Sequence, residues 1–202
     1  MKCSECHMSY AEDSSDDRRL HRTYHDKIVN GIPAPQLKSD KTIWRRGEDH
    51  IIVVDAFSLK AQRVRVARVG RAANQEMHYD GGVYSEYEQP DNREIRLFLY
   101  ISSNRAVGLS ILEKRSDICR CTWEEYDGRV LKKLEQKEPI WSLGFTWVHK
   151  NHRRRSIANI LLTEAAQYLG VSVNDVGVCT PFSDDGNAFV RSFFPEGFLI
   201  AK

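Results

Sequence analysis

Four residues near the start of the chain have the types and the spacing of a zinc site. They are Cys3, Cys6, His21 and His25. Thiolates and imidazoles are the donors that tetrahedral zinc takes, and their order and spacing are those of a Cys2His2 finger. Two histidines four positions apart lie on one face of a helix, so both can reach one ion. We therefore predict that residues 1–30 form a zinc finger with these four ligands, and His7 is a rival ligand.

A second cluster of basic and small residues lies later in the chain. It reads His-Arg-Arg-Arg-Ser-Ile-Ala over residues 152–158, between a predicted strand and a predicted helix. A loop there would direct backbone N–H groups and the positive end of the helix at one point, with arginines beside them. Ser156 and Ala158 would let a ligand approach the backbone. The pattern predicts an anion site that fits a diphosphate; the alternative is a nuclear-localisation-like cluster or a solvated basic face.

The elements that must hold these two sites follow from hydrophobic periodicity. Residues 50–55 have the length and β-branched content of a buried strand. Residues 59–77 contain no proline and have apolar residues at helical spacing, so they predict a helix. Residues 80–92 contain two glycines, a proline and many polar residues, which predict a loop. Strands are then predicted in four ranges, as consecutive antiparallel neighbours: 95–102, 106–112, 118–123 and 140–149. Residues 156–169 form the clearest amphipathic helix, and Gly170 ends it. Short strands at 175–180 and 198–201 follow, with a second short element near 187–194.

This order of elements predicts an α+β fold, in which a mixed, mainly antiparallel sheet carries helices on its faces. Pro33 and Pro35 fix their own backbone and keep the preceding residues out of a helix, so residues 31–35 read as an extended connection. We expect three parts in sequence: a zinc finger over residues 1–30, a linker over residues 31–45 and a larger domain over residues 46–202.

Composition limits the classes of function. The chain has 202 residues, 41% of them hydrophobic, and a formal net charge of +2. That charge gives no general argument for nucleic acid or a membrane, so any basic site must be local. We expect no membrane segment and no disulfide framework, because no apolar run approaches about 18 residues and the five cysteines are an odd number. Asp16 and Asp17 at the start of the finger helix argue against sequence-specific DNA reading by the finger.

Several further motifs accompany the finger and the basic loop. They are Ile52-Val53-Val54-Asp55, Leu97-Phe98-Leu99-Tyr100, Val107-Gly108-Leu109 and Gly144-Phe145-Thr146-Trp147-Val148. From residue 3 to about residue 200, the combination resembles the sister-chromatid cohesion acetyltransferases. Arg-x-x-Ser-x-Ala over residues 153–158 resembles the Arg/Gln-x-x-Gly-x-Gly/Ala loop of the GCN5-related N-acetyltransferases, with Ser156 in place of the first glycine.

The resemblance implies a GCN5-related fold and a nuclear enzyme that transfers acetyl from acetyl-CoA to a lysine of the Smc3 subunit of cohesin. The Smc3 head would be the protein substrate, and the replication clamp and chromatin become candidate further partners. A non-enzymatic interaction module and an acetyltransferase with a different amine substrate are the competing hypotheses.

The resemblance also implies which residues bind acetyl-CoA. The strand over residues 146–148 would offer main-chain groups to the pantetheine arm and the acetyl carbonyl, and the basic loop would hold the pyrophosphate. The residues carried over are Thr146, Trp147, Val148, Arg153, Arg154, Arg155, Ser156, Ile157, Ala158, Asn159, Phe182, Ser183 and Asp184.

The base that deprotonates the amine is the point at which this chain departs from the family. A Ser followed by Gln or Asp in the family is Cys179 followed by Thr180 here, and a frequent acidic position is Thr163, with Glu164 next to it. We predict Thr180 and Glu164 as catalytic residues, the first by resemblance and the second because a carboxylate can accept a proton. Asp184 and Asp185 are the other carboxylates near the expected cofactor, and an apolar strand makes Cys179 an inert core thiol.

Overall fold

The computed structural model describes residues 1–78, 94–130, 132–133 and 138–201. Within them, strands join into one mixed sheet in the order β2-β3-β4-β5-β8-β9-β10-β6-β7, and β1 pairs with β5. The strands are β1 (Ile32–Pro33), β2 (Lys41–Arg46), β3 (Asp49–Val54), β4 (Ile95–Ser102), β5 (Arg105–Arg115), β6 (Ile118–Cys121), β7 (Lys132–Lys133), β8 (Ile140–Val148), β9 (Gly177–Cys179) and β10 (Phe198–Ala201). The predicted α+β class with a mainly antiparallel sheet is confirmed.

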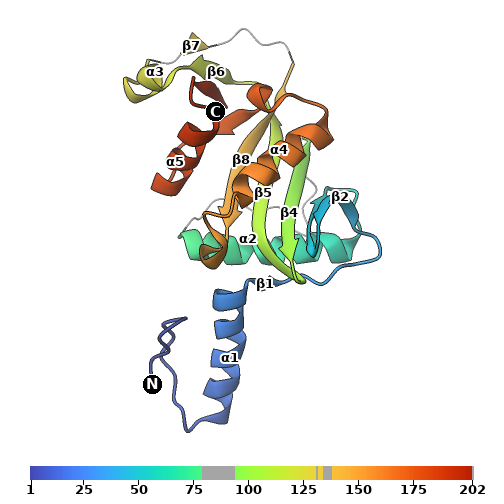
Figure 1. The fold of residues 1–202 in the computed structure, drawn as a ribbon, viewed down its shortest axis with the longest axis vertical. Coiled ribbons are helices and arrows are strands. Elements are labelled where there is room, and N and C mark those ends of the chain that lie inside the picture. Colours follow the sequence, from blue (N-terminus) through green and yellow to red (C-terminus); the bar gives the residue numbers. More distant parts are fainter. Residues whose placement is uncertain (79–93, 131, 134–137, 202) are drawn as a thin grey trace.

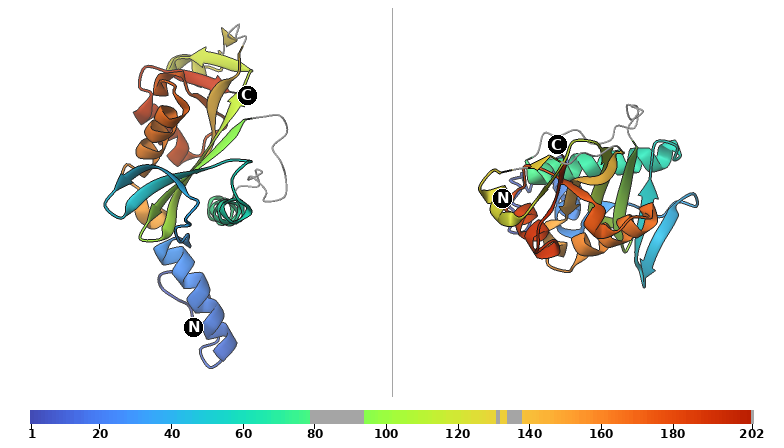
Figure 2. Two further views of the ribbon diagram at one scale, coloured as in Figure 1. Left: turned by 90° about the vertical axis from the view of Figure 1, so that its right-hand side faces the viewer. Right: turned by 90° about the horizontal axis from the view of Figure 1, so that it is seen from above.

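Helices cover both faces of this sheet (Figures 1 and 2). The α-helices are α1 (Ser15–Asn30), α2 (Lys60–Met77), α3 (Trp123–Asp127), α4 (Ile157–Leu169) and α5 (Asp184–Phe193). Val66, Val69 and Ala73 of α2 are buried against one face of the central strands. Leu161 and Ala165 of α4 are buried against the other face, together with Val190 of α5. Two short 3-10 helices, Lys150–His152 and Val173–Asp175, precede α4 and β9.

The pairing of the strands corrects one part of the sequence prediction. β3, β4 and β5 are consecutive antiparallel neighbours, but β8, not β6, pairs with the far side of β5. β6 pairs antiparallel with β10, and β9 pairs in parallel with both β8 and β10. Strand 118–123 is also too long as predicted, because Thr122 caps α3 through the N–H of Glu125 and Trp123 begins that helix. Residues 80–92, predicted as a loop, lie outside the described residues.

Residues 31–45 do more than connect the finger to the domain. Ile32 and Ala34 are buried, and Ile32 lies opposite Ala106 in the pairing of β1 with β5. β2 then begins at Lys41 as an edge strand of the sheet. Residues 31–35 are therefore extended, as predicted, and the segment is built into the domain, while α1 projects away from it (Figure 1).

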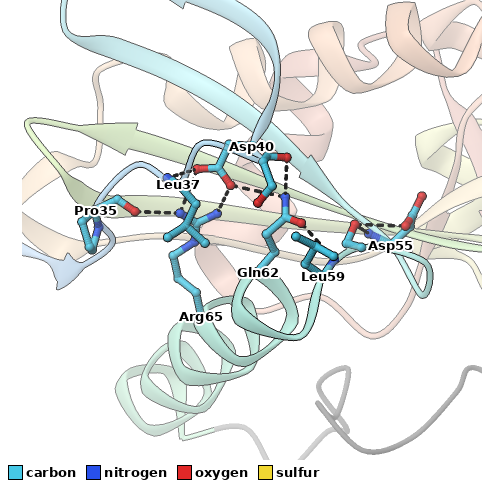
Figure 3. Close-up of polar contacts among 9 residues, drawn as sticks. Pro35, Leu37, Asp40, Asp55, Leu59, Gln62 and Arg65 are labelled. Atoms are coloured by element: carbon cyan, nitrogen blue, oxygen red, sulfur yellow. Dashed lines mark hydrogen bonds and ion pairs between the residues drawn. The ribbon is translucent and has the colours of Figure 1, made fainter.

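A buried ion pair fixes this segment to α2 (Figure 3). Arg65 donates to Asp40 Oδ2 at 2.9 Å and to the carbonyl of Pro35 at 2.8 Å, and both side chains of the pair are almost wholly buried. Leu37 N–H also donates to Asp40, and Gln62 donates to the carbonyl of Ser39. Burial alone would raise the pKa of Asp40, but the hydrogen bonds from Arg65 and Leu37 hold it below its usual value.

We predict that Asp40→Asn lowers the free energy of unfolding by about 3–5 kcal/mol, because it leaves the buried guanidinium of Arg65 without its counter-charge. Asp127→Asn is the control: Asp127 pairs with Arg191, its side chain is 57% exposed, and the change should have little effect. Because the pKa of Asp40 is depressed in the fold, the difference between wild type and Asp40→Asn should shrink as pH falls below about 4. Urea unfolding followed by tryptophan fluorescence measures the free energy of unfolding of each variant and its dependence on pH. Equal losses of unfolding free energy in Asp40→Asn and Asp127→Asn would contradict the prediction.

Candidate metal centre and active site

The four predicted zinc ligands come together beside α1. An isolated bridge between Lys2 and Ser9 folds the first residues back, and His21 and His25 project from one face of the helix. One ligand atom from each of Cys3, Cys6, His21 and His25 lies within 4.8 Å of the others. His7 is not part of this group.

The chemistry of this donor set fits zinc. His21 Nε2 is buried and has no hydrogen-bond partner, which is the state of a ligand atom directed at an ion. The backbone N–H groups of Cys6 and Glu5, followed by the His21 ring, lower the pKa of the Cys3 thiol to about 6, so a thiolate forms readily. α1 buries no residue of its own, so the finger lacks a core that could replace the metal. The ring of Tyr10 stacks on His21 with centroids 4.0 Å apart.

We predict that Cys6→Ser abolishes stoichiometric zinc binding and reduces the helical signal of α1, because the metal supplies most of the stability of residues 1–30. The main unfolding transition of the sheet should remain. His7→Ala is the matched control and should retain one zinc per chain. Metal analysis of the purified variants, together with circular dichroism, decides the point; zinc retained by Cys6→Ser or lost from His7→Ala would contradict this ligand set.

The C-terminal end of α1 is held by the segment that follows β8. His149 Nε2 donates to the carbonyl of Lys27 at 3.2 Å, and Asn151 donates to the carbonyl of Val29 at 2.9 Å. Burial lowers the pKa of His149, so the ring is neutral, in agreement with its Nδ1 accepting the N–H of Asn151. Arg105 at the start of β5 completes the contact through Asp26 at 2.6 Å. Carbonyls at the helix end that have no partner within the helix are thereby satisfied.

β8 and β9 part at a bulge in β8. The parallel pairing joins only Ser142 to Gly177 and Leu143 to Val178. On the opposite edge of β8, the register with β5 shifts between Leu143 and Phe145, which leaves Gly144 as the extra residue. Beyond Gly144, β8 keeps its hydrogen bonds to β5 but has lost its partner on the β9 side. Its free edge then offers backbone N–H and C=O groups to a ligand.

A cleft of about 660 Å³ opens along this free edge. Its walls come from the end of β8, the turn before α4, the first half of α5 and the end of α2. Eleven of the thirteen residues predicted to bind acetyl-CoA line it: Thr146, Trp147, Val148, Arg153, Arg154, Ser156, Ile157, Ala158, Asn159, Ser183 and Asp184. Arg155 and Phe182 are not among its lining residues. The sequence thus predicted a set of residues that the fold brings together around one hollow.

The positive end of the cleft is the N-terminus of α4. Ser156 is the N-cap residue and has a left-handed backbone with φ of 58°, a conformation that glycine adopts without strain. A left-handed backbone at this position accounts for the glycine of the related loop pattern, and in this chain serine adopts it. Arg154 also has a positive φ, of 61°, and its side chain is 84% exposed. An anion placed here would meet backbone N–H groups and one exposed guanidinium.

Arg153 has a different part in the same loop. Its guanidinium donates to Val148 O at 3.1 Å, to Asp185 at 2.8 Å and to Glu76 at 3.3 Å. Glu76 also accepts from Trp147 Nε1 and from the N–H of Lys150. Arg153 and Glu76 therefore connect β8, α2 and α5 around the cleft. Arg153 holds these three elements together through hydrogen bonds within the cleft wall.

Close packing sets the position of α4 on the sheet. A Cβ at Gly108 of β5 would come within 2.9 Å of Ile157 and Leu161 side-chain atoms. Only a residue without a side chain allows this approach, and Ile157 and Leu161 are both buried there. The start of α4, and with it the anion end of the cleft, is positioned by this contact.

Comparison with known proteins gives the family. Residues 1–27 match the family described as the zinc-finger of acetyl-transferase ESCO. The N-acetyltransferase ECO1 of Kluyveromyces lactis is 26% identical over 82% of this chain and 73% of its own length. That of Candida glabrata is 24% identical over 82% and 71%. The solved xEco2 acetyltransferase domain bound to a CoA conjugate shares the fold, with a TM-score of 0.65 over 82% of this chain and 98% of that one, at 18% identity.

These matches support the ESCO/Eco1 family for this chain. Its members are the sister-chromatid cohesion acetyltransferases that the sequence resembles, and the prediction of an acetyltransferase with an N-terminal zinc finger is confirmed. Within the described residues, no helix combines the length and apolarity needed to cross a bilayer.

The two residues predicted to be catalytic, Thr180 and Glu164, are not among the residues that line the cleft. Glu164 lies on the same face of α4 as Ile160 and Tyr168, which are four residues before and after it. The Tyr168 hydroxyl accepts a hydrogen bond from Lys41 of β2. Glu164 is therefore on the side of α4 that faces β2. The structure does not bring it to the cleft. Thr180 directly follows β9 and stands where β9 and β8 separate, at the closed end of the opening. Their catalytic roles stay predictions, and the position of Thr180 suits one better than that of Glu164.

Sequence reasoning missed three features of this site. Glu76 reaches the cleft from the last turn of α2, and Phe189 lines it from α5. Gly144 supplies the bulge at which β8 leaves β9. A glycine inside an apolar strand is a signal for a bulge, so Gly144 could have been found from the sequence. No local signal marks Glu76, because its three donors come from residues about seventy positions later.

Proposed function

We propose that this protein transfers the acetyl group of acetyl-CoA to a lysine amine of the Smc3 subunit of cohesin, and that it does so in the nucleus. The family supports a cohesion acetyltransferase, and the observation that carries the cofactor assignment is the cleft itself. It runs from the N-terminus of α4, which suits a diphosphate, along the free edge of β8, which suits an extended chain with amide groups. A pantetheine diphosphate has these two parts in this order.

Different residues of the cleft would bind the diphosphate and the pantetheine arm of acetyl-CoA. N–H groups at the start of α4 and the side chain of Arg154 would hold the diphosphate, while Arg153 keeps the loop in place from within the wall. The free edge of β8 over Thr146–Val148 would hold the pantetheine arm by main-chain hydrogen bonds. Bound acetyl-CoA supplies an activated thioester carbonyl. A backbone N–H on this edge would stabilise the negative charge that its oxygen gains when the amine attacks.

The cofactor assignment predicts that Arg154 and Arg155 differ, although they are neighbours and both exposed. Arg154→Glu should weaken acetyl-CoA binding by about tenfold or more, because a negative charge enters the lining of the cleft. Arg155→Glu carries the same change in net charge outside the lining, so it should weaken binding by less than about threefold. Calorimetric titration with acetyl-CoA measures both, and zinc content should stay at wild-type level. Equal effects in the two variants, or no binding by wild type, would contradict the proposal.

The substrate assignment requires a separate measurement. The purified protein with acetyl-CoA should acetylate a cohesin Smc3 head on lysine, detected by mass spectrometry, at least tenfold faster than it acetylates free lysine or spermidine at equal amine concentration. A small amine acetylated faster than the head would favour the alternative amine substrate. No transfer to any amine, despite binding of acetyl-CoA, would favour an interaction module.

A further inference from the structure

A carboxylate that the sequence did not single out lies beside the closed end of the cleft, next to the bulge of β8 and outside the residues that line the cleft. Glu113 is on β5, and its Oε1 is 3.2 Å from the place that a Cβ on Gly144 would occupy. Gly144 is the bulged residue at which β8 parts from β9, two positions along β8 from Thr146 in the cleft wall. Two residues of strand span roughly 6.6 Å, so Glu113 lies just beyond the part of β8 that would carry the acetyl group.

Arg115 holds this carboxylate in position. The two side chains lie on the same face of β5, and Arg115 Nε donates to Glu113 Oε1 at 2.9 Å. The Glu113 side chain is only 13% exposed, so its orientation is set by this pair and by the strands around it. In the pairing with β8, Glu113 lies opposite Ser142, a fully buried residue whose hydroxyl is bonded to the backbone of β8 itself. β8 itself carries no acidic residue, so the carboxylate beside its bulge comes from β5.

Glu113 approaches the closed end from the face of the sheet opposite to α4. Residues of β5 alternate between the faces: Leu109 belongs to the core beneath α2, and Glu113 follows it at an even spacing. Leu112, one position earlier, belongs to the core beneath α4. The anion end of the cleft is at the start of α4. An amine that enters from the α2 face would therefore meet the acetyl carbon from the side opposite to the diphosphate, with Glu113 beside it.

The carboxylates that line the cleft lie in its wall or at its anion end, away from the bulge. Glu76 accepts hydrogen bonds from Trp147, Lys150 and Arg153. Asp185 pairs with Arg153 and Arg154 at the other end of the cleft. Asp184 is in the first turn of α5, beside the predicted diphosphate position and away from the bulge. Among the carboxylates of the described residues that this site contains, Glu113 alone stands at the place where β8 and β9 part.

We propose that Glu113 is a catalytic residue that accepts the proton of the substrate ammonium, with Arg115 as its positioning residue. This rests on the acetyl transfer to an amine proposed above. A lysine side chain has an ordinary pKa of about 10.4 and is protonated at neutral pH, so it must lose one proton before its lone pair can attack. Glu113 takes that proton and returns it to water. The nitrogen then bonds to the acetyl carbon, the carbon–sulfur bond breaks, and the CoA thiolate leaves as the nitrogen gives up its second proton, which yields the amide and CoA thiol.

The test compares Glu113→Gln with wild type across pH, using whichever amine the wild-type protein acetylates, so that a wrong acceptor in the proposed function does not bear on Glu113. At pH 7.5 the value of kcat/KM for the amine should fall about 100-fold or more, while the Kd of acetyl-CoA stays within about twofold. As pH rises towards the pKa of the amine, solvent deprotonates it, so the rate of the variant should climb and the gap should close to less than about tenfold by pH 10.

Glu94→Gln is the matched control, because Glu94 is an exposed carboxylate directly before β4 that pairs with Lys114 of β5 at 3.1 Å. It should leave kcat/KM within about twofold. Glu113→Asp keeps the carboxylate on a side chain that is shorter by one methylene. Its kcat/KM should lie between those of Glu113→Gln and wild type, which separates a chemical role from loss of fold. Arg115→Lys should lower kcat with little change in the Kd of acetyl-CoA. A Glu113→Gln variant that binds acetyl-CoA normally and keeps more than a third of the wild-type kcat/KM, or whose defect is the same at every pH, would overturn the proposal.

Discussion

The separation of β8 from β9 is the constraint on which the site depends. Parallel strands normally continue to pair along their common length, and a ligand could reach neither backbone if they did here. One extra residue at Gly144 bends β8 away after only two paired positions. β8 can leave its partner because its other edge remains bonded to β5, so the strand stays ordered while one edge becomes available. The cleft is thus opened by backbone geometry. The side chains that line it determine its charge and its hydrogen-bonding groups.

A set of polar contacts then keeps this opening from closing or spreading. Arg153 and Glu76 connect β8, α2 and α5, which are brought together from distant parts of the chain. Each contact is partly exposed and would contribute little to the free energy of unfolding by itself. Their effect is positional, since the same loop also carries the N-cap of α4. The buried pair of Asp40 and Arg65 acts one step earlier, because it fixes the start of α2 and so the place that Glu76 can reach.

The sequence predicted those parts of the molecule that local spacing encodes. The zinc ligands, the helix beginning near Ile157 and the basic turn before it depend on residues a few positions apart, and all three were recognised. Strand partners are different: β6 has the same apolar pattern as its neighbours, and only the packing of Trp123 on Phe198 and the pairing with β10 place it at the far side of the sheet. Glu113 was missed for the same reason, because its significance comes from a bulge in another strand thirty-one positions later.

The finger is joined to the site more closely than its projecting position suggests. α1 buries no residue, yet its last carbonyls accept from His149 and Asn151, which lie between the end of β8 and the arginines of the cleft. A helix end can hold such donors only while the helix itself is formed, and the metal is what forms it. His149 is neutral and buried in this contact, so it acts as a fixed hydrogen-bonding link. Order that zinc imposes on residues 1–30 when bound would therefore reach the turn that begins the cleft, so the finger would help to position the loop before α4.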